Sequence, residues 1–371
     1  MSKRIFFLAD GGSPHTIKWA KSLAHSGYEI FIFGLASFSP DLYRDEPRIK
    51  TWSFGADTPV TKSGNGSFQK IRYLSSLSKL KQLIAEFKPD ILHVHFVSSY
   101  GLLGSLSGFP KIFMSVWGAD VYDFPEKSFL HRLVLRFNLK KAQSLFSTSN
   151  VMAKQASKYT QKEINVIPFG IELSKFRPGK SELIIWEGNN LILGTVKSLE
   201  DKYGIDDLIK AFAILKKRLP DQSLKLLIVG KGTKELELKA LAEKMKVSQD
   251  IHFTGWIPVE KVPEYHKLLD ISVFPSILDS ESFGVAVVEA SASEKPVIVS
   301  RVGGLIEVVN ENVTGLVVPP KNPEALAVAM EKLVLDPTLR EKFGKAGRER
   351  VEKLYNWDQN LSDMVSFYEK N

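Results

Sequence analysis

Short apolar runs alternate along the chain with segments in which apolar residues return every three or four positions. Residues 5–9 form a continuous apolar run, the pattern of a buried parallel strand. A glycine turn follows, and Ser13 and Pro14 supply the N-cap and first position of a helix that ends at Gly27. Residues 29–34 predict the next strand. The chain therefore opens as a βαβ unit with a glycine turn at the start of its helix.

The alternation loosens between residues 167 and 179 and then begins again. Strands are predicted at residues 191–196, 224–229, 251–253, 271–274 and 296–300, with helical apolar spacing between most of them. Two successive βα series predict an α/β protein of two doubly wound, Rossmann-like domains facing a cleft, over residues 1–170 and 171–354. Residues 57–67 are rich in proline, glycine, serine and threonine and predict a loop.

Composition and charge narrow the function classes. The 371 residues (41.6 kDa) include no cysteine, which excludes a disulfide scaffold, thiolate metal ligands and a cysteine nucleophile. The net charge of +8 is unevenly divided: residues 1–170 hold 22 Lys and Arg against 12 Asp and Glu, whereas residues 171–371 hold 28 against 30. The basic first half is compatible with an anionic membrane, an anionic acceptor or nucleic acid as partner, and equally with ordinary solubility charge.

No segment predicts a membrane span. The longest stretch without a charged residue, 91–110, is interrupted by two histidines, four serines, three glycines and a closing proline. Residues 4–9, apolar after Arg4, are followed by Asp10 before the apolar region of a secretory signal is complete. Together with the missing cysteines, this predicts a cytoplasmic protein.

The chemically most informative segment runs from residue 274 to residue 309. A predicted strand ends there, a loop carries Glu281, and a helix begins just after Gly284 and carries Glu289. Free backbone N–H groups at a helix start can hold a phosphate or a sugar hydroxyl, and carboxylates can accept hydrogen bonds from vicinal hydroxyls. The pattern suits a diphosphate joined to two sugars. A capping acid followed by a solvated helix acid has the same spacing.

This segment resembles the family-4 (GT4) retaining glycosyltransferases, which have the GT-B fold. The shared features are the Pro-Ser turn at 275–276, Glu-Ser-Phe-Gly at 281–284, Glu-Ala at 289–290 and the Gly-Gly pair at 303–304. The resemblance implies that Glu281 contacts the donor sugar and that Glu289 binds the nucleotide ribose. It further implies that backbone N–H groups of Phe283, Gly284 and Val285 hold the sugar or diphosphate. In the family the last helix, here about 355–371, returns to the first domain.

The strand-to-loop segment 194–204 corresponds to the family's phosphate-binding segment, with two departures. Thr195 stands where the family has an arginine, and Tyr203 separates Lys202 from Gly204. Lys197 is the candidate substitute cation, and with Lys202 it would stabilise a departing diphosphate in place of a metal ion. A solvated position at a strand end fits Lys197 equally well, whereas the functional role is favoured for Lys202.

Two further segments of the second half resemble donor-binding parts of the family. Gly230 belongs to a Gly-Lys-Gly turn that follows a predicted strand and resembles the family's turn near the nucleotide. Ile257 lies in a segment whose backbone meets the base in the family, where Trp256 is equally compatible with plain packing. No cofactor and no metal are implied, because the nucleotide-diphospho-sugar is a substrate and no His/Asp cluster has convincing metal spacing.

The first half carries the residues expected beside the acceptor and the transferred sugar. Gly11 and Gly12 match the family's N-terminal glycine loop, and His95 ends a Pro-Asp-x-x-His-x-His strand. The resemblance implies that this loop closes over the donor phosphates and borders the acceptor, with Gly12 on the donor side and Gly11 on the acceptor side. Trp117 replaces the histidine of the family's His-Gly-x-Asp motif, and it can stack on a sugar but cannot exchange a proton. Asp120 is retained and is expected to orient the acceptor. These glycines and His95 are equally compatible with a tight turn and a structural hydrogen bond.

Residues 127–142 predict a basic amphipathic helix. Its apolar positions and its five lysines and arginines suit a seat on anionic lipid, but a domain helix with a solvated face is the favoured interpretation from sequence. Nucleic-acid binding is not expected, because no motif of that class accompanies the charge.

The sequence thus predicts a retaining, metal-independent hexosyltransferase that moves a sugar from a nucleotide-diphospho-sugar to an acceptor hydroxyl. A carbohydrate or lipid-linked acceptor of bacterial-type polysaccharide, O-antigen or glycolipid biosynthesis fits the basic first domain, as does peripheral association with an anionic membrane. A non-catalytic nucleotide-sugar-binding module and a GT-B epimerase are the alternatives. The sugar, the base (UDP, GDP or ADP), the acceptor, the linkage and the oligomeric state do not follow from the residues.

Overall fold

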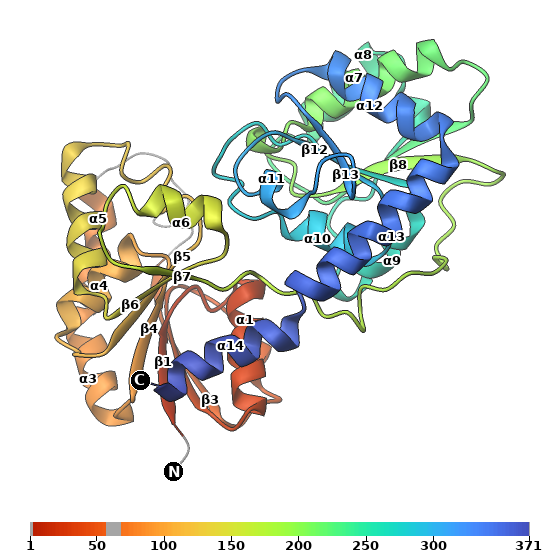
Figure 1. Ribbon diagram of the computed structural model, residues 1–371. Coiled ribbons are helices and arrows are strands. Elements are labelled where there is room, and N and C mark those ends of the chain that lie inside the picture. Colours follow the sequence, from red (N-terminus) through yellow and green to blue (C-terminus); the bar gives the residue numbers. More distant parts are fainter. Residues whose placement is uncertain (1–2, 57–67, 371) are drawn as a thin grey trace. The chain divides into compact units, whose positions relative to one another are not determined.

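The computed structural model describes residues 3–56 and 68–370, so the loop predicted at 57–67 lies outside the described residues. The chain divides into two units, residues 1–168 with 361–371 and residues 169–360 (Figure 1). The sequence placed this junction two residues later, and it placed the start of the returning segment six residues earlier.

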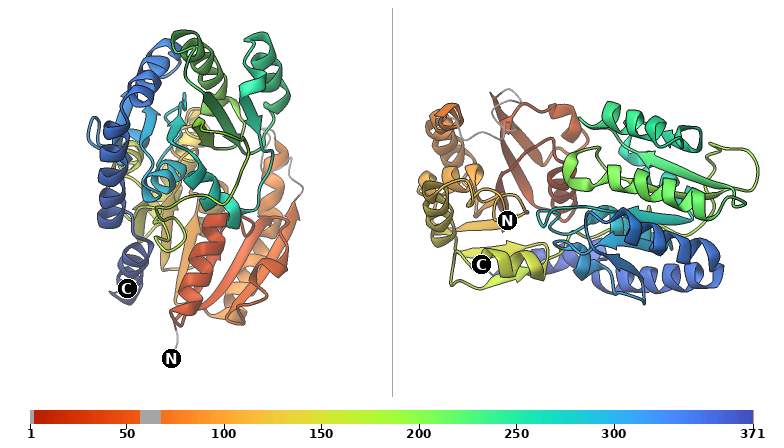
Figure 2. Two further views of the ribbon diagram at one scale, coloured as in Figure 1. Left: turned by 90° about the vertical axis from the view of Figure 1, so that its right-hand side faces the viewer. Right: turned by 90° about the horizontal axis from the view of Figure 1, so that it is seen from above.

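A parallel sheet forms the centre of the first unit. Its seven described strands lie in the order β3-β2-β1-β4-β5-β6-β7, and helices cover both faces (Figures 1 and 2). The strands are β1 (Arg4–Leu8), β2 (Glu29–Ala36), β3 (Ile49–Ala56), β4 (Ile91–His95), β5 (Ile112–Val116), β6 (Ser144–Ser147) and β7 (Ile164–Val166). The α-helices are α1 (Pro14–His25), α3 (Leu77–Phe87), α4 (Ser99–Ser107), α5 (Phe129–Lys141) and α6 (Asn150–Ala156).

The second unit repeats this architecture with the strand order β10-β9-β8-β11-β12-β13 among its described residues. The strands are β8 (Leu191–Val196), β9 (Leu224–Val229), β10 (Ile251–Phe253), β11 (Ile271–Phe274), β12 (Val297–Ser300) and β13 (Gly315–Val318). The helices are α7 (Ile205–Arg218), α8 (Glu235–Lys244), α9 (Val262–Leu268), α10 (Val285–Ala292), α11 (Leu305–Val308), α12 (Pro323–Leu335) and α13 (Pro337–Leu354). The order reverses between β8 and β11, and ligands of doubly wound sheets bind at the carboxyl ends of the strands at this reversal.

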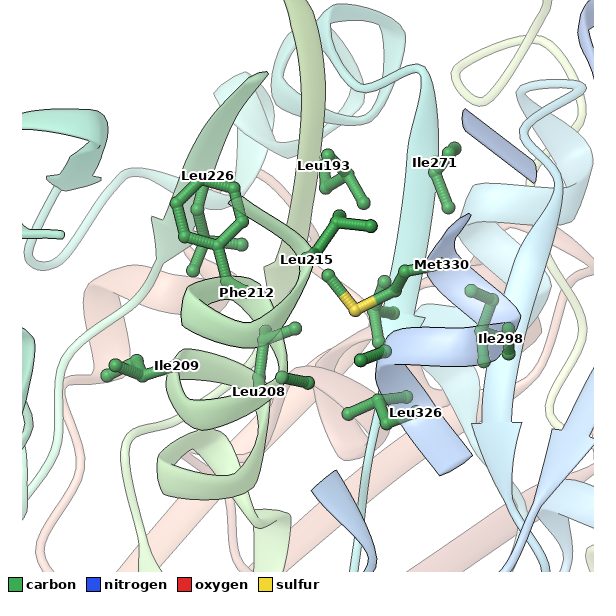
Figure 3. Packing of buried hydrophobic residues seen from close by; sticks show 14 of the residues in the cluster. Leu193, Leu208, Ile209, Phe212, Leu215, Leu226, Ile271, Ile298, Leu326 and Met330 are labelled. Carbon is green, nitrogen blue, oxygen red and sulfur yellow. The ribbon is translucent and has the colours of Figure 1, made fainter. Parts of the chain in front are cut away.

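The core of the second unit follows from the apolar spacing of α7. Leu208, Phe212 and Leu215 recur at helical intervals and point toward the strands, where Leu193 and Ile298 meet them (Figure 3). Helix α12 adds a further apolar stripe beside α7. Leu193 and Ile298 are fully buried, since helices cover both faces of a parallel sheet. The sheet is thereby a rigid base for the loops at its carboxyl edge.

The last helix, α14 (Trp357–Lys370), belongs to both units. At its start, the Trp357 N–H donates to the Ile171 carbonyl within the second unit. Near its end, Tyr368 is fully buried in the first unit, and its hydroxyl lies 2.6 Å from Nδ1 of His93. Nε2 of His93 lies 2.8 Å from the Ser115 hydroxyl, so this histidine is a structural link between α14 and the sheet. No helix among the described residues is long and apolar enough to cross a bilayer.

Candidate functional site

The predicted donor-side residues of the second unit gather at the reversal of its strand order. Lys197 directly follows β8, and Glu281 lies in the loop between β11 and α10. Although 84 residues separate them in sequence, Lys197 Nζ lies 2.8 Å from Glu281 Oε1. Their side chains are 17% and 8% exposed, so this is a mostly buried ion pair.

The charge on Lys197 is stabilised by its neighbours. Burial by itself favours the neutral amine. It is outweighed by electrostatic attraction to Glu281, Tyr203 and Glu289 and by the hydrogen bond to Glu281, which together raise the pKa of Lys197. Lys197 is therefore protonated at neutral pH. A protonated amine, two carboxylates and the start of α10 share this edge of the sheet, an arrangement that can stabilise a developing phosphate charge and accept sugar hydroxyls.

Tyr203 joins the two predicted cations. Lys197 Nζ lies 4.4 Å from the centroid of its ring, and Lys202 Nζ lies 4.7 Å from the same centroid. Both distances are within the range of a cation–π contact. Sequence reasoning treated Tyr203 only as an interruption of the Lys-Gly pattern, although an aromatic residue beside a lysine was the signal.

Close backbone contacts fix the loop that carries Lys202. Gly204 has φ of +61°, and a Cβ there would lie 2.2 Å from the Pro275 carbonyl oxygen. The Ile277 N–H donates to the Lys202 carbonyl at 2.8 Å. The segment after β8 and the Pro-Ser turn after β11 are therefore packed directly on each other, which positions both cations relative to Glu281.

The Gly-Gly pair holds the loop of Glu281. The Gly304 N–H donates to the Glu281 carbonyl at 2.8 Å, and the Gly303 N–H donates to Asp279 Oδ1 at 2.9 Å. A Cβ at Gly303 would lie 2.3 Å from the Glu281 carbonyl oxygen, and φ of +43° further disfavours other residues. Asp279 thus serves the shape of this loop, a role that sequence reasoning did not assign.

Helix α10 begins immediately after this loop. Gly284 is its N-cap in the left-handed conformation with φ of +92°, Phe283 is buried, and Val285 is its first residue. The free N–H groups of the first turn lie at the carboxyl edge of the sheet. Glu289 lies one turn further along, and its Oε2 is 3.4 Å from Nε2 of His266, a fully buried histidine that sequence reasoning missed.

The remaining donor-side predictions lie next to β8 or at the end of β10. A Cβ on Gly230 would lie 2.2 Å from the Lys197 carbonyl oxygen, so this glycine allows the close approach of the two loops. Thr195 is fully buried in β8, and the residue that reaches Glu281 is Lys197, which follows this strand. Ile257 packs beside Leu227 and its neighbours, whereas Trp256 is exposed.

In the first unit, the glycine loop follows β1 at the reversal between β1 and β4. A Cβ on Gly11 would overlap the Phe38 ring at 2.4 Å, and the Gly11 carbonyl accepts a hydrogen bond from Tyr43 at 2.7 Å. Gly12 donates its N–H to Asp10 Oδ1 at 3.0 Å, and a Cβ there would meet atoms only at 3.5 Å or more. Packing against Phe38 therefore requires glycine at position 11, whereas there is room for a side-chain methyl group at position 12.

His95 and Trp117 lie together beside this loop. Their ring centroids are 4.6 Å apart, and the ring of Phe7, which belongs to β1, lies 4.7 Å from that of His95. Nδ1 of His95 is buried and has no hydrogen-bond partner among the described residues. Burial, with smaller contributions from His93 and His15, holds the pKa of His95 well below its ordinary value. His95 is thus a neutral imidazole next to a half-buried indole, a surface suited to a sugar.

Asp120 shapes the loop that carries Trp117. It is fully buried, and its oxygens accept hydrogen bonds from the N–H groups of Val97, Trp117 and Gly118 at 2.8 to 3.3 Å. Burial raises its pKa to about 6 although these N–H groups favour the carboxylate. The geometry makes Asp120 a positioning residue for Trp117, because its oxygens are already occupied by the backbone.

Comparisons with known proteins decide the family. The model of group 1 glycosyl transferases matches residues 182–350, and that of 4-like glycosyl transferases matches residues 4–149. The chain belongs to the group 1 (GT4) glycosyltransferases. The family and the GT-B fold predicted from the sequence are confirmed.

Curated relatives and solved structures agree with this assignment. The GDP-mannose-dependent alpha-(1-6)-phosphatidylinositol monomannoside mannosyltransferase of Mycobacterium tuberculosis is 30% identical over 214 residues, or 55% of each chain. The D-inositol 3-phosphate glycosyltransferase of Corynebacterium jeikeium is 32% identical over 56% of this chain and 52% of its own. The match therefore spans about half the length of these relatives. Sucrose-phosphate synthase of Thermosynechococcus elongatus shares the fold, with a TM-score of 0.82 and 21% identity over 99% and 98% of the chains.

Proposed function

We propose that this glycosyltransferase moves a hexose from a nucleotide-diphospho-sugar to an acceptor hydroxyl with retention of configuration. The observation that carries the proposal is the buried Lys197–Glu281 pair at the strand reversal of the second unit. A cation fixed beside a carboxylate suits a leaving diphosphate joined to a sugar, because one group meets the phosphate charge and the other the hydroxyls. We accordingly assign the donor to the second unit and the acceptor to the first.

Each donor-side group has a distinct role in this proposal. Lys197, Lys202 and the first N–H groups of α10 stabilise the diphosphate, while Glu281 accepts hydrogen bonds from the sugar and Glu289 from the ribose. Glu281 can serve both Lys197 and a hydroxyl, since a carboxylate has about four lone-pair positions.

The chemical step needs no protein base in this proposal. The bond between the anomeric carbon and the diphosphate oxygen breaks, and the acceptor oxygen bonds to that carbon on the same face. The acceptor proton passes to the departing phosphate oxygen. Trp117 and neutral His95 provide the surface beside the sugar. This fits a step without a protein base, because an indole cannot take up the acceptor proton.

For the acceptor, we propose a carbohydrate or a lipid-linked sugar in bacterial-type polysaccharide, O-antigen or glycolipid synthesis. Support comes from the basic first half, with 22 Lys and Arg against 12 Asp and Glu, and from relatives named for phosphatidylinositol mannoside and inositol phosphate acceptors. We place the protein in the cytoplasm, peripherally attached to the inner face of the membrane.

A thermal-shift screen of UDP-, GDP- and ADP-sugars tests the donor assignment first, because a bound ligand raises the melting temperature with its concentration. Transfer of the labelled sugar from the best donor to lipid and saccharide acceptors then tests the reaction. We expect Glu281→Ala to abolish transfer while the fold persists. Tight binding without turnover would instead indicate a binding module, and sugar isomerisation without an acceptor an epimerase. Activity lost with a chelator and restored by Mg²⁺ would contradict the metal-free mechanism.

A further inference from the structure

The outward side of α5 carries large apolar residues that the fold leaves uncovered. Phe129 and Leu130 are 66% and 70% exposed, and Leu133 and Phe137 are 43% and 38% exposed. At 3.6 residues per turn, these four positions lie within an arc of roughly 100° on one side of the helix. We call this side, with the cations Arg136, Lys140 and Lys141 that accompany it, the α5 outer face. Single exposed apolar residues are ordinary, but four on one helix face require an explanation.

Positive charge accompanies the apolar stripe. Arg136, Lys140 and Lys141 are exposed, and none of them forms an ion pair with another described residue. From residue 127 to residue 162 the chain contains eight lysines and arginines and no acidic residue, although Glu126 immediately precedes this stretch. The surface is therefore apolar and cationic together.

The opposite side of α5 holds the helix in place. Leu135 and Leu139 are buried in the core of the first unit, and the amide nitrogen of Asn138 donates to the carbonyls of Val97 and Ser98 at 2.9 and 3.1 Å. Ser128 caps the helix by accepting the His131 N–H. Since the inner side alone supplies these anchors, the outer face is free to vary without loss of the fold, yet it carries phenylalanine and leucine.

We propose that the α5 outer face docks on the surface of a bilayer that contains anionic lipid. Aromatic and leucine side chains on a fixed helix can enter the boundary between headgroups and acyl chains, while lysines and arginines meet lipid phosphates. The inference deepens the proposed function, because it rests on the assignment of a membrane-attached acceptor and names the surface that reaches it. Helix α5 packs against α4, which lies on the sheet of the first unit (Figure 1).

Charge argues against other occupants of this face. A second copy of the chain, joined by two-fold symmetry, would bring Arg136, Lys140 and Lys141 against the same three cations. Nucleic acid would neutralise the cations but would leave Phe129 and Leu130 without an apolar environment. An anionic bilayer satisfies the charge and the apolar surface at once.

Vesicle binding by the full chain tests the proposal. Binding to phosphatidylcholine vesicles, with and without about one third phosphatidylglycerol, is measured by co-sedimentation. We expect binding to the anionic vesicles only. Phe129→Gln with Leu130→Gln should weaken it more than tenfold, and Arg136→Gln, Lys140→Gln and Lys141→Gln together should weaken it about 100-fold, at about fivefold per cation.

Matched variants of the second unit serve as controls. Ile184→Gln with Leu236→Gln removes two apolar residues that are even more exposed than Phe129 and Leu130. Lys332→Gln, Lys342→Gln and Lys353→Gln remove the same net charge from exposed lysines. Both should bind vesicles as the unmodified protein does, and all variants should keep their melting temperature.

The outcomes separate this proposal from the proposed function. A Glu281→Ala protein that loses transfer but still binds vesicles would show that membrane docking does not depend on sugar transfer, so the two proposals can fail separately. The docking proposal is overturned if the unmodified protein does not bind anionic vesicles, or if the α5 variants bind as well as their controls. It is also overturned if sedimentation shows a dimer that the α5 variants dissociate, since the face would then join two copies.

Discussion

The Lys197–Glu281 pair allows stability and catalysis to be separated by one set of variants. Lys197→Met leaves the carboxylate of Glu281 mostly buried without its cation, because the two atoms lie 2.8 Å apart and the side chains are only 17% and 8% exposed. Breaking a buried pair by removing one partner costs about 3–5 kcal/mol. The residual exposure of Lys197 favours the lower end of that range, about 3 kcal/mol.

This cost can be measured as a change in melting temperature. For a unit of this size, 1 kcal/mol corresponds to about 2–4 °C, so Lys197→Met should lower the melting temperature of the second unit by about 6–12 °C. Adding Glu281→Gln removes both charges and should restore most of this loss. As a control, Lys345→Met breaks an exposed pair with Glu341 and should leave the melting temperature unchanged.

Turnover should behave differently from stability. If Lys197 meets the charge that develops on the diphosphate, Lys197→Met should lower kcat by about 10²–10³, the effect of deleting one preorganised charge-stabilising group. The double variant should remain inactive although its stability has returned. Initial rates of sugar transfer with the donor found by thermal shift, measured below the melting temperature of the weakest variant, provide the comparison.

Two results would refute this reasoning. Recovery of turnover in the double variant would mean that Lys197 only neutralises Glu281 and does not act on the donor. An unchanged melting temperature in Lys197→Met would mean that Glu281 is solvated once its partner is removed, so the pair does not hold the loop in place.

Three further predictions follow from contacts in the first unit. Gly12→Ala should keep the melting temperature, because a Cβ there meets only atoms at 3.5 Å or more, and it should raise KM for the donor. Gly11→Ala should lower the melting temperature through overlap with the Phe38 ring, and equal effects of the two variants would contradict the donor role of Gly12. The pKa of Asp120 is about 6 in the folded protein against about 3.9 when unfolded, so its protonation stabilises the fold fully below pH 4, and this contribution is lost as the pH rises through 6. Asp120→Asn should remove this pH dependence of the free energy of unfolding, about 3 kcal/mol, measured by urea unfolding. Tyr368→Phe should cost about 1–3 kcal/mol by leaving Nδ1 of His93 buried without a partner, with no change of this cost between pH 5 and 8, because burial lowers the pKa of His93 to about 3.

Strands whose two faces are covered could be predicted from the sequence alone. The observed β8, β9 and β11 have the predicted bounds, because most positions of such a strand are apolar and the apolar run ends with the strand. The pattern gives no prediction for β3, which lies at the edge of its sheet and places Lys50 and Ser53 among its apolar residues. At an edge, pairing with β2 and not burial decides the strand.

The members of the candidate site could be predicted, but their contacts could not. Glu281 and Lys197 follow from the motif and from charge, yet their pairing depends on the adjacency of β8 and β11, strands that are distant in sequence. Tyr203 illustrates the limit: in sequence it separates Lys202 from Gly204, and in the structure its ring lies against both lysines. Asp120 shows the reverse, since the retained acid suggests chemistry and the fold gives its oxygens to the backbone.

The uneven charge of the chain has a local origin that leads to a final prediction. Residues 1–170 carry an excess of 22 − 12 = +10, and residues 127–162 alone supply +8 of it. The excess therefore lies largely in and around α5 and α6 of the first unit, whereas the donor site depends on one buried cation and its neighbour. Raising the salt from about 0.1 M to about 1 M shortens the Debye length from about 10 Å to about 3 Å and screens exposed charges far more than buried ones. Vesicle binding should then fall steeply, while the dissociation constant of the nucleotide sugar should change much less. A parallel fall of both would show that the donor, too, is held by exposed charge, which would contradict the role assigned to Lys197.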